Sequence, residues 1–437
     1  MRTPDRSSAS RRNWLRRSTQ TLGLAVLGVS FGLGAANSAH AADQFTDWGW
    51  PLPYEKVSDK SVQWLKDKGW WPIHVAFQPT WGGGATINIV MDRLELLKKR
   101  GVDTKFQGFV GGPAVNEVIV SSRFQVANGG NLPFALLLDK RVPVKSIAIV
   151  TPNIAHALVV PNDSPIKSFK DLKGSNPPAT IGLVTGSSGE FYVQAAAQAN
   201  GIEIGKDVIL KNMPPAEQML LPRGLTAVAT WDPIISMMTH ERKNGRVVDT
   251  IYPYNMYEGT FYVRDELIQN VPDVVQAFSD AFAEAVLWTR RNPQKAVDLT
   301  AEDPSVKLFP KAVLLQQIEL YNNYYKPTYI FPHGEFWGQA NASLFKWMQE
   351  QNRISRPMTA QDFAASIDDR FMKRTFERLG WAVPAQPPFI PKGWTGSPAK
   401  TPYPPYLTPL DGKPQVFPET GDLVKPWGFA GQMHAPK

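Results

Sequence analysis

The sequence predicts an α/β fold with two similar units, each built on a largely parallel sheet covered by helices. Short apolar runs suited to buried strands alternate with helical segments, and short Gly-rich turns join them. This alternation starts near residue 73 and begins again after residue 160. The 437-residue chain is long enough for two lobes or domains, and without cysteine it must depend on apolar cores rather than disulfides.

The first unit is expected to alternate strands and helices up to residue 150. Its clearest helix covers 85–100, where apolar residues recur at a period near 3.6 and a basic last turn precedes Gly101. Asn131 suits the N-cap of a later helix, with Pro133 in its first turn. The strands are expected at 73–77, 104–109, 124–127 and 144–150, and the other helices at 114–121 and 132–138.

Three Gly-rich loops follow the strands of the first unit. They are expected at 79–84, 110–113 and 128–131. In sheets of this kind ligands bind beyond the carboxyl ends of the strands, which makes these loops candidates for a binding site. Gln78, Thr80 and Trp81 follow the first strand, and Trp81 could either wall a pocket or cover its loop. Gly111 and Gly112 could offer backbone N–H groups or only form a turn.

The second unit repeats the pattern, and helices dominate after it. A short amphipathic helix is expected at 166–174, and a further helix follows the Gly-Ser-Ser sequence at 186–188. The strands are expected at 154–160, 179–184, 207–210, 227–230 and 247–251. The later helices are expected at 271–291, 311–322, 335–351 and 359–380.

Residues 1–41 predict an export signal. A basic run with the pair Arg11-Arg12 precedes the apolar stretch 22–33, and Ala39-His40-Ala41 forms a small-x-small cleavage site. The basic run resembles the twin-arginine motif of proteins exported already folded, and an arginine-rich Sec signal is the alternative. We therefore expect a periplasmic protein whose signal is cleaved near Ala41.

The ends of the chain also explain its charge and its proline content. Residues 1–41 hold six Arg and one Asp, which leaves a formal charge of +3 of the total +8 for the rest of the chain. This small charge, without a basic patch rich in aromatic residues, does not indicate a nucleic-acid partner. Residues 384–437 are rich in proline, and we expect an extended tail that is either wrapped on the surface by its aromatic residues or partly disordered.

Three motifs carry a resemblance to a known family. They are 159–161 followed by Asp171-Leu172-Lys173-Gly174, Gly186-Ser187-Ser188, and Thr230-Trp231-Asp232-Pro233. In this order they resemble the nitrate/sulfonate/taurine group of periplasmic solute-binding proteins of ABC importers. The likeness covers about residues 70–350, and it implies the two-lobed type II periplasmic-binding-protein fold.

The resemblance implies how the chain is divided and what it binds. A small organic anion, either a sulfonate or a carboxylate and with or without an aromatic group, would lie between two lobes that close on it. The partners would be an ABC permease with its ATPase, and the protein would be a monomer without a cofactor. The divisions would be the signal at 1–41, an aromatic extension at 42–69, lobe 1 at 70–158 and 250–383, lobe 2 at 159–249, and the tail at 384–437.

The Gly186-Ser187-Ser188 turn is the main candidate for anion binding. It opens a helix whose first N–H groups lack partners, and the two hydroxyls could add donors. An ordinary serine N-cap is the alternative. Glu190, in the first turn, suits the helix dipole but would repel an anion. Asn131 is a second candidate contact, although a cap alone would also explain it.

The Trp231-Asp232 pair lies at the end of an expected strand. Trp231 could pack on a ligand, whereas we expect Asp232 to cap the segment that starts at Pro233. Asp232 could instead bind a ligand amine.

Catalysis is poorly supported by the sequence. The six histidines are scattered without metal-ligand spacing, and no G-x-S-x-G elbow is present, so we expect no metal site and no catalytic residues. Two alternatives to an importer component stay open. One is a binding module that feeds a receptor, and the other is a periplasmic hydrolase that uses Ser187 or Ser188 as its nucleophile.

Overall fold

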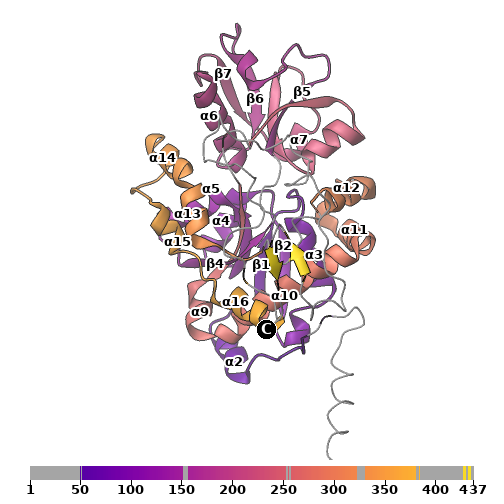
Figure 1. Ribbon diagram of the computed structural model, residues 1–437, viewed down its shortest axis with the longest axis vertical. Helices are drawn as coiled ribbons and strands as arrows, with labels where there is room; N and C mark the ends of the chain where they lie inside the picture. The colour runs from indigo at the N-terminus through magenta and orange to yellow at the C-terminus, as the bar shows by residue number, and fades with distance from the viewer. Residues whose placement is uncertain are drawn as a thin grey trace, which may run out of the picture. The chain divides into compact units, whose positions relative to one another are not determined.

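The computed structural model describes residues 50, 52–150, 156–251, 254, 257–321, 330–379, 383, 427–429 and 432–434 of the chain. The expected export signal, most of the expected tail and the expected break at 151–153 lie outside these residues. The described chain forms an α/β fold with two five-stranded sheets (Figure 1). Within the described residues, no helix has the length and apolar character needed to cross a membrane.

The first sheet consists of β1 (Ile73–Phe77), β2 (Thr104–Gly108), β3 (Val126–Gly130), β4 (Val144–Val150) and β10 (Gly259–Arg264). Its strand order is β2-β1-β3-β10-β4. β1, β2 and β3 are parallel as expected, whereas β10 runs antiparallel to both β3 and β4. The sequence analysis missed β10, a buried strand that the chain contributes only after it has left the second sheet.

The second sheet repeats this arrangement. It consists of β5 (His156–Pro161), β6 (Ala179–Leu183), β7 (Val208–Asn212), β8 (Ala227–Trp231) and β9 (Gly245–Thr250), in the order β7-β6-β8-β5-β9. β6, β7 and β8 are parallel, and β5 is antiparallel to β8 and β9. The chain therefore enters this sheet at β5, ahead of the expected lobe boundary at residue 159, and returns to the first sheet at β10.

Helices cover both sheets. Before the second sheet they are α2 (Asp59–Asp67), α3 (Gly84–Arg93), η1 (Lys98–Arg100), α4 (Gly112–Val120) and α5 (Asn131–Asp139). Those of the second unit are η2 (Phe169–Leu172), α6 (Ser188–Asn200), α7 (Pro215–Gln218), α8 (Ile234–Ser236) and η3 (Met237–Glu241). The expected helix at 166–174 is therefore only the short 3₁₀ turn η2, which a Ser168–Asp171 capping box starts.

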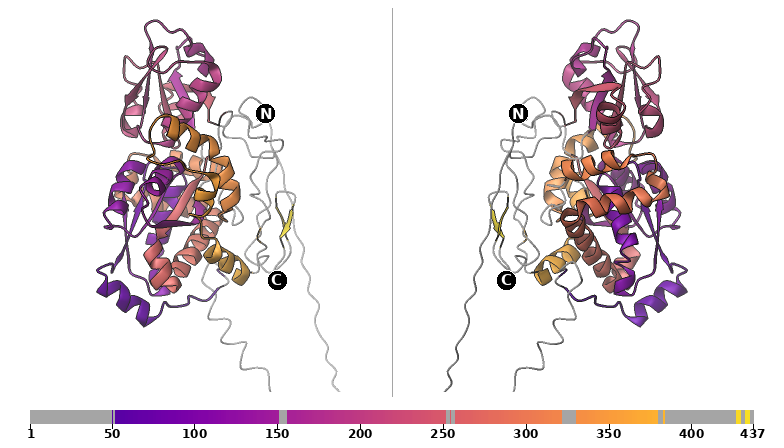
Figure 2. Two further views of the ribbon diagram at one scale, coloured as in Figure 1. Left: turned by 90° about the vertical axis from the view of Figure 1, so that its left-hand side faces the viewer. Right: turned by 90° about the vertical axis from the view of Figure 1, so that its right-hand side faces the viewer.

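The C-terminal helices pack beside the first sheet (Figure 2). They are α9 (Asp265–Asn270), α10 (Pro272–Arg291), α11 (Pro293–Glu302), η4 (Pro304–Val306), α12 (Lys311–Tyr321), α13 (Gly334–Ala340), α14 (Ala342–Glu350), α15 (Ala360–Ala364) and α16 (Arg370–Leu379). α16 illustrates why they dock, because its buried residues recur every three or four positions along one face. The backbone before α16 is hydrogen-bonded to β4, where Ser146 N donates to Ser366 O over 2.9 Å.

Three expected helices are interrupted, and the first two breaks each serve a buried polar contact. The helix expected at 85–100 ends at Arg93, where Glu95 has a left-handed backbone with φ 52° and Leu96 N donates to Met91 O. The displaced end of this segment buries Arg100 against Glu284. The helix expected at 335–351 breaks at Asn341, whose fully buried side chain turns inward. The one expected at 359–380 is likewise divided into α15 and α16.

The prediction of a loop at 128–131 is wrong. Residues 128–130 continue β3 and pair with β10, with Gly129 opposite Thr260 and Gly130 opposite Gly259. The missed strand β10 is the reason, because it offers backbone partners that the sequence pattern did not indicate. α5 starts directly afterwards, so Gly130 is its N-cap and Asn131 lies inside the helix.

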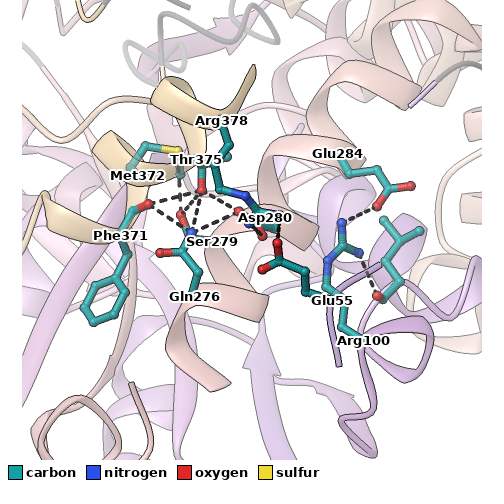
Figure 3. Close-up of polar contacts among 11 residues, drawn as sticks. Glu55, Arg100, Gln276, Ser279, Asp280, Glu284, Phe371, Met372, Thr375 and Arg378 are labelled. Carbon is teal, nitrogen blue, oxygen red and sulfur yellow. Dashed lines mark hydrogen bonds and ion pairs between the residues drawn. The ribbon is translucent and has the colours of Figure 1, made fainter. Parts of the chain in front are cut away.

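The buried ion pair between Arg100 and Glu284 (Figure 3) is contacted by the start of the described chain. Arg100 Nη2 lies 2.7 Å from Glu284 Oε2, and Tyr54 Oη donates to Glu284 Oε1 over 2.7 Å. A second ion pair, between Glu55 and Arg378, joins the same N-terminal segment to α16 at 3.1 Å. Breaking the buried Arg100–Glu284 pair by removing one partner would cost about 3–5 kcal/mol. The aromatic extension is joined to this pair by the Tyr54 hydrogen bond and to α16 by the Glu55–Arg378 pair.

Two short strands lie within the expected Pro-rich tail. β11 (Trp427–Phe429) and β12 (Gln432–His434) pair antiparallel with each other. They form a two-stranded sheet of their own and join neither of the larger sheets.

Candidate functional site

The loops at the carboxyl ends of β1, β3 and β8 meet the start of α6 around a small cavity, which we call the cleft cavity. Its volume is about 20 Å³, which is enough for one water molecule. It is lined by Gln78, Trp81, Gly112, Gly130, Pro133, His156, Ser187, Ser188, Trp231 and Tyr257. Residues from both sheets contribute to this lining, which contains no Lys, Arg, Asp or Glu side chain.

Direct contacts between the two sheets' loops keep the cleft cavity small. Trp231 Nε1 donates to Thr80 O over 2.8 Å, and Gly82 N donates to Asp232 O over 2.9 Å. The sheets are therefore held in a closed arrangement. An organic ligand can enter only if these contacts separate.

The start of α6 satisfies most of its own hydrogen-bonding groups. The Ser187 hydroxyl donates to Val184 O over 2.6 Å, and the Ser188 hydroxyl donates to Asn131 Oδ1 over 2.9 Å. Gly186 N donates to the Glu190 carboxylate over 2.7 Å. By contrast, Ser188 N and Gly189 N have no acceptor among the described residues. The free donors of this turn are thus two backbone N–H groups rather than two hydroxyls.

Glu190 has a structural partner. Its carboxylate is buried, accepts from Gly186 N at one oxygen, and forms an ion pair with Arg353 at the other. Arg353 follows α14, so this pair joins α6 to the C-terminal helices. The repulsion that Glu190 would exert on an anion is therefore reduced by an adjacent cation.

A chain of buried side chains, which we call the polar chain, leads from the cleft cavity into lobe 1. Ser188 Oγ donates to Asn131 Oδ1, and Asn131 Nδ2 donates to Asn341 Oδ1 over 2.9 Å. Asn341 Nδ2 then donates to Glu258 Oε1 over 2.8 Å. Leu132 N also donates to Asn131 Oδ1, which fixes the orientation of the Asn131 amide. Asn131 therefore accepts a hydrogen bond from the start of α6 and does not cap α5.

Glu258 ends the polar chain in a fully buried position. Burial raises the pKa of its carboxyl group well above the ordinary value, although the hydrogen bond from Asn341 works in the opposite direction. Its second oxygen, Oε2, has no hydrogen-bond partner in the described structure. A protonated carboxyl group fits this position, because an ionised one would be left partly unpaired away from water.

Aromatic rings form much of the wall of the cleft cavity. The His156 and Tyr257 ring centroids lie 4.7 Å apart, and Trp81 meets Tyr257 edge-on at 6.4 Å. Trp81 also covers the backbone, because a Cβ atom at Gly259 would lie 2.2 Å from its ring. Trp81 Nε1 is buried without a hydrogen-bond partner. Trp81 thus both walls the cavity and covers a glycine, and it adds a free N–H donor.

The predicted site residues fall into two groups. Those in the lining of the cleft cavity are Gln78, Trp81, Gly112, Ser187, Ser188 and Trp231. Thr80 contributes its carbonyl oxygen to the contact with Trp231, and Asn131 lies in the polar chain. Asp232 is fully buried and accepts from Ser236 N over 3.1 Å and from the Ser236 hydroxyl over 2.8 Å. Gly111 is the N-cap of α4, and Gly186 lines a neighbouring groove.

Sequence reasoning missed four lining residues, Gly130, Pro133, His156 and Tyr257. Gly130 was assigned to a loop, and Tyr257 stands just before the missed strand β10. Gly130 is in close contact with both lobes, because a Cβ atom there would lie 2.8 Å from Tyr257 Oη and 2.9 Å from Ser188 Oγ. The glycine pair Gly129-Gly130 at the end of an apolar run was the signal available for this close approach.

The described residues contain no group of three or more His, Cys, Asp or Glu side chains that could hold a metal ion. The cleft cavity has backbone N–H and indole N–H donors at its edge, and aromatic rings form part of its lining. Such a site can hold oxygen acceptors of a ligand through N–H groups and pack its carbon atoms against rings.

Comparisons with known proteins agree with this architecture. Residues 96–296 match the family described as NMT1/THI5 like. A Bacillus subtilis protein named for binding aliphatic sulfonates is 26% identical over 215 residues, which cover 48% of this chain and 62% of that protein. A Brucella abortus protein named as a binding protein is 24% identical over 237 residues, covering 53% of this chain and 71% of that protein.

Solved structures show the same fold. The alkanesulfonate-binding protein of Xanthomonas axonopodis pv. citri bound to MOPS has a TM-score of 0.56 at 16% identity, covering 68% of this chain and 98% of that one. The periplasmic nitrate-binding protein of Synechocystis PCC 6803 also has a TM-score of 0.56, at 15% identity, with 75% and 92% covered. The predicted two-lobed periplasmic-binding-protein fold and the resemblance to this group of binding proteins are confirmed.

Glu258 gives a testable pH dependence. Its pKa is raised above the ordinary value of 4.5 in the folded protein, so between these two pKa values the folded state binds more protons than the unfolded state. Its contribution to stability therefore falls as pH rises through this window. Glu258→Gln keeps the acceptor for Asn341 and stays neutral. We expect its melting temperature to rise relative to that of the wild type as the pH increases above the ordinary carboxyl pKa of 4.5.

Differential scanning fluorimetry of both proteins at several pH values would measure this. The exposed Glu95 provides a control, since Glu95→Gln removes a carboxylate that pairs with Lys98 on the surface and should show little change with pH. A constant difference between Glu258→Gln and the wild type would mean that Glu258 is ionised in the folded protein.

Proposed function

We propose that this protein is the solute-binding component of an ABC-type importer, and that it captures a small organic anion between two lobes. The proposed lobes are 70–158 with 250–383, and 159–249. The fold and the resemblance to periplasmic binding proteins support this proposal. Closure of the lobes on the ligand would create the surface that a membrane permease, driven by its ATPase, could recognise.

The observation that carries the proposal is the set of unpartnered N–H donors at the start of α6 and in the lining of the cleft cavity. Ser188 N and Gly189 N lie at the N-terminus of the 13-residue helix α6, where the helix dipole favours negative charge. Trp81 Nε1, on a residue of the other lobe that lines the same cavity, is a buried donor without an acceptor. Because buried donors are costly to leave unpaired, a ligand that supplies acceptors would stabilise the closed form.

A sulfonate or a carboxylate fits these donors best. Its oxygens could accept from two or three N–H groups at once, while Trp81, Trp231 and Tyr257 pack against its carbon atoms. The names of two similar proteins, which refer to sulfonates, point in the same direction. Nitrate has no carbon atoms to use the aromatic wall, so it is the less favoured ligand. An aromatic carboxylate or sulfonate would use this wall most fully.

The structure gives the hydrolase alternative less support, whereas the receptor alternative needs a functional test. In the hydrolase alternative Ser187 or Ser188 would need a general base, yet their hydroxyls donate to a backbone carbonyl and to an asparagine. A binding module that feeds a receptor would have the same lobes and the same cavity. Binding of a permease to the closed form would decide in favour of the importer component.

A thermal-shift screen tests the proposal. We expect stabilisation by one or more sulfonates or aromatic carboxylates and a smaller effect from nitrate and from neutral pyrimidines. A ligand at a hundredfold excess over its Kd should stabilise the folded protein by about 2.7 kcal/mol. A flat result across all four classes would contradict the proposal.

We also propose that the protein works in the periplasm as a monomer, after export and cleavage near Ala41. The basic run and apolar stretch of residues 1–41 support export. Intact mass spectrometry of protein recovered from the periplasm should give the mass of a chain that starts at residue 42. Recovery of a chain that retains Arg11 and Arg12 would contradict the signal assignment.

A further inference from the structure

The cleft cavity is too small to hold more than part of an organic ligand. Its volume of about 20 Å³ fits a single water molecule, whereas sites for organic ligands usually measure about 300–1,000 Å³. Even if the lobes separate slightly to admit an anionic group, the aromatic wall and Pro133 limit the remaining space. The carbon skeleton of a longer ligand needs room elsewhere.

Such room exists next to the cavity, in a groove between α4 and α5 that we call the α4–α5 groove. Its volume is about 430 Å³, within the usual range for a ligand site. Its floor and walls include the apolar side chains of Pro113, Val120, Leu136 and Leu137. Val120 is 49% exposed, although it is a large apolar side chain.

The groove and the cleft cavity share their boundary. Gly112 and Ser187 line the cavity, and the residues bonded to them, Pro113 and Gly186, line the groove. Gly186 and Pro113 come from different lobes and face each other, because a Cβ atom at Gly186 would lie 3.5 Å from Pro113 Cγ. A side chain at Gly186 would therefore contact Pro113 between the cavity and the groove.

The charges around the groove favour an uncharged occupant. Glu117 and Lys140 line it as well, so the groove has one charge of each sign and no net charge. A second charged group on the ligand would gain little there, whereas an alkyl or aryl group would remove Val120 and Leu136 from water. The apolar lining thus complements the donor-rich cavity beside it.

We infer that the α4–α5 groove binds the apolar part of the ligand while the start of α6 holds its anionic group. The ligand class is therefore an amphiphilic anion, a sulfonate or carboxylate with a chain of several carbon atoms or an aryl group. This inference rests on the proposed function, since it assumes that the anionic group binds at the cleft cavity. Nitrate and the shortest sulfonates would occupy only the cavity.

A series of linear alkanesulfonates from methanesulfonate to hexanesulfonate tests the inference by isothermal titration calorimetry of the full chain after removal of its signal. Burial of one methylene group is worth at most about a fourfold gain in affinity, and a half-open groove should give about twofold. Hexanesulfonate should therefore bind at least about tenfold more tightly than methanesulfonate. Equal affinities across the series would overturn the inference and leave the proposed function intact.

Two variants of the α4–α5 groove test whether the alkyl chain of the ligand binds there. Val120→Asn replaces an exposed apolar side chain with a neutral polar one, and Ser121→Trp places a bulky ring at the groove. Both should leave the affinity for methanesulfonate unchanged and lower that for hexanesulfonate at least about threefold. The control is Ile209→Asn, because Ile209 is 46% exposed and lies on β7, away from the groove.

The outcomes separate the two proposals. Chain-length dependence that survives in both groove variants would place the apolar part elsewhere and overturn the inference. An equal loss in Ile209→Asn would also overturn it, since the effect would then be general. Failure of every sulfonate and carboxylate to bind would instead contradict the proposed function itself.

Discussion

Backbone N–H groups that are buried at a helix N-terminus need hydrogen-bond acceptors. The candidate binding site depends on which N–H groups at the start of α6 find an acceptor within the protein. The Glu190 carboxylate accepts a hydrogen bond from Gly186 N, and Arg353 balances the negative charge of this carboxylate. The hydroxyls of Ser187 and Ser188 already donate within the protein, so they are not the free groups that the sequence indicated. The turn is left with two N–H groups and no resident acceptor for them, which is the requirement that an anionic ligand would meet.

Closure of the lobes is coupled to the same requirement. Ser188 belongs to the second lobe, but its hydroxyl finds its acceptor, Asn131, in the first. Asn131 is held in turn by Asn341 and, through it, by Glu258. Opening the cleft would leave this buried oxygen with one donor fewer, at a cost typical of an unmade hydrogen bond, about 1–3 kcal/mol. The polar chain therefore favours the closed form through a hydrogen bond between the neutral side chains of Ser188 and Asn131.

The sequence predicted the parts of this structure that depend on local patterns. Apolar runs and Gly-rich turns predicted β1 and the β6–α6 junction, because burial and turn geometry there depend on residues that are close in the sequence. β10 was missed because its partners, β3 and β4, lie more than a hundred residues away. The same long-range pairing turned an expected loop into strand at Gly130. The role of Asn131 could not be predicted either, since its partners Ser188 and Asn341 come from distant segments.

The central claim is that two backbone N–H groups of α6, rather than its serine hydroxyls or Gly186, hold the anionic group. Amide chemical shifts measured by NMR during titration with a bound sulfonate test it most directly. The account predicts that the amide protons of Ser188 and Gly189 move downfield as they gain a charged acceptor, while that of Gly186 stays in place because Glu190 already occupies it. A saturable shift at Gly186, with none at Ser188 or Gly189, would contradict it.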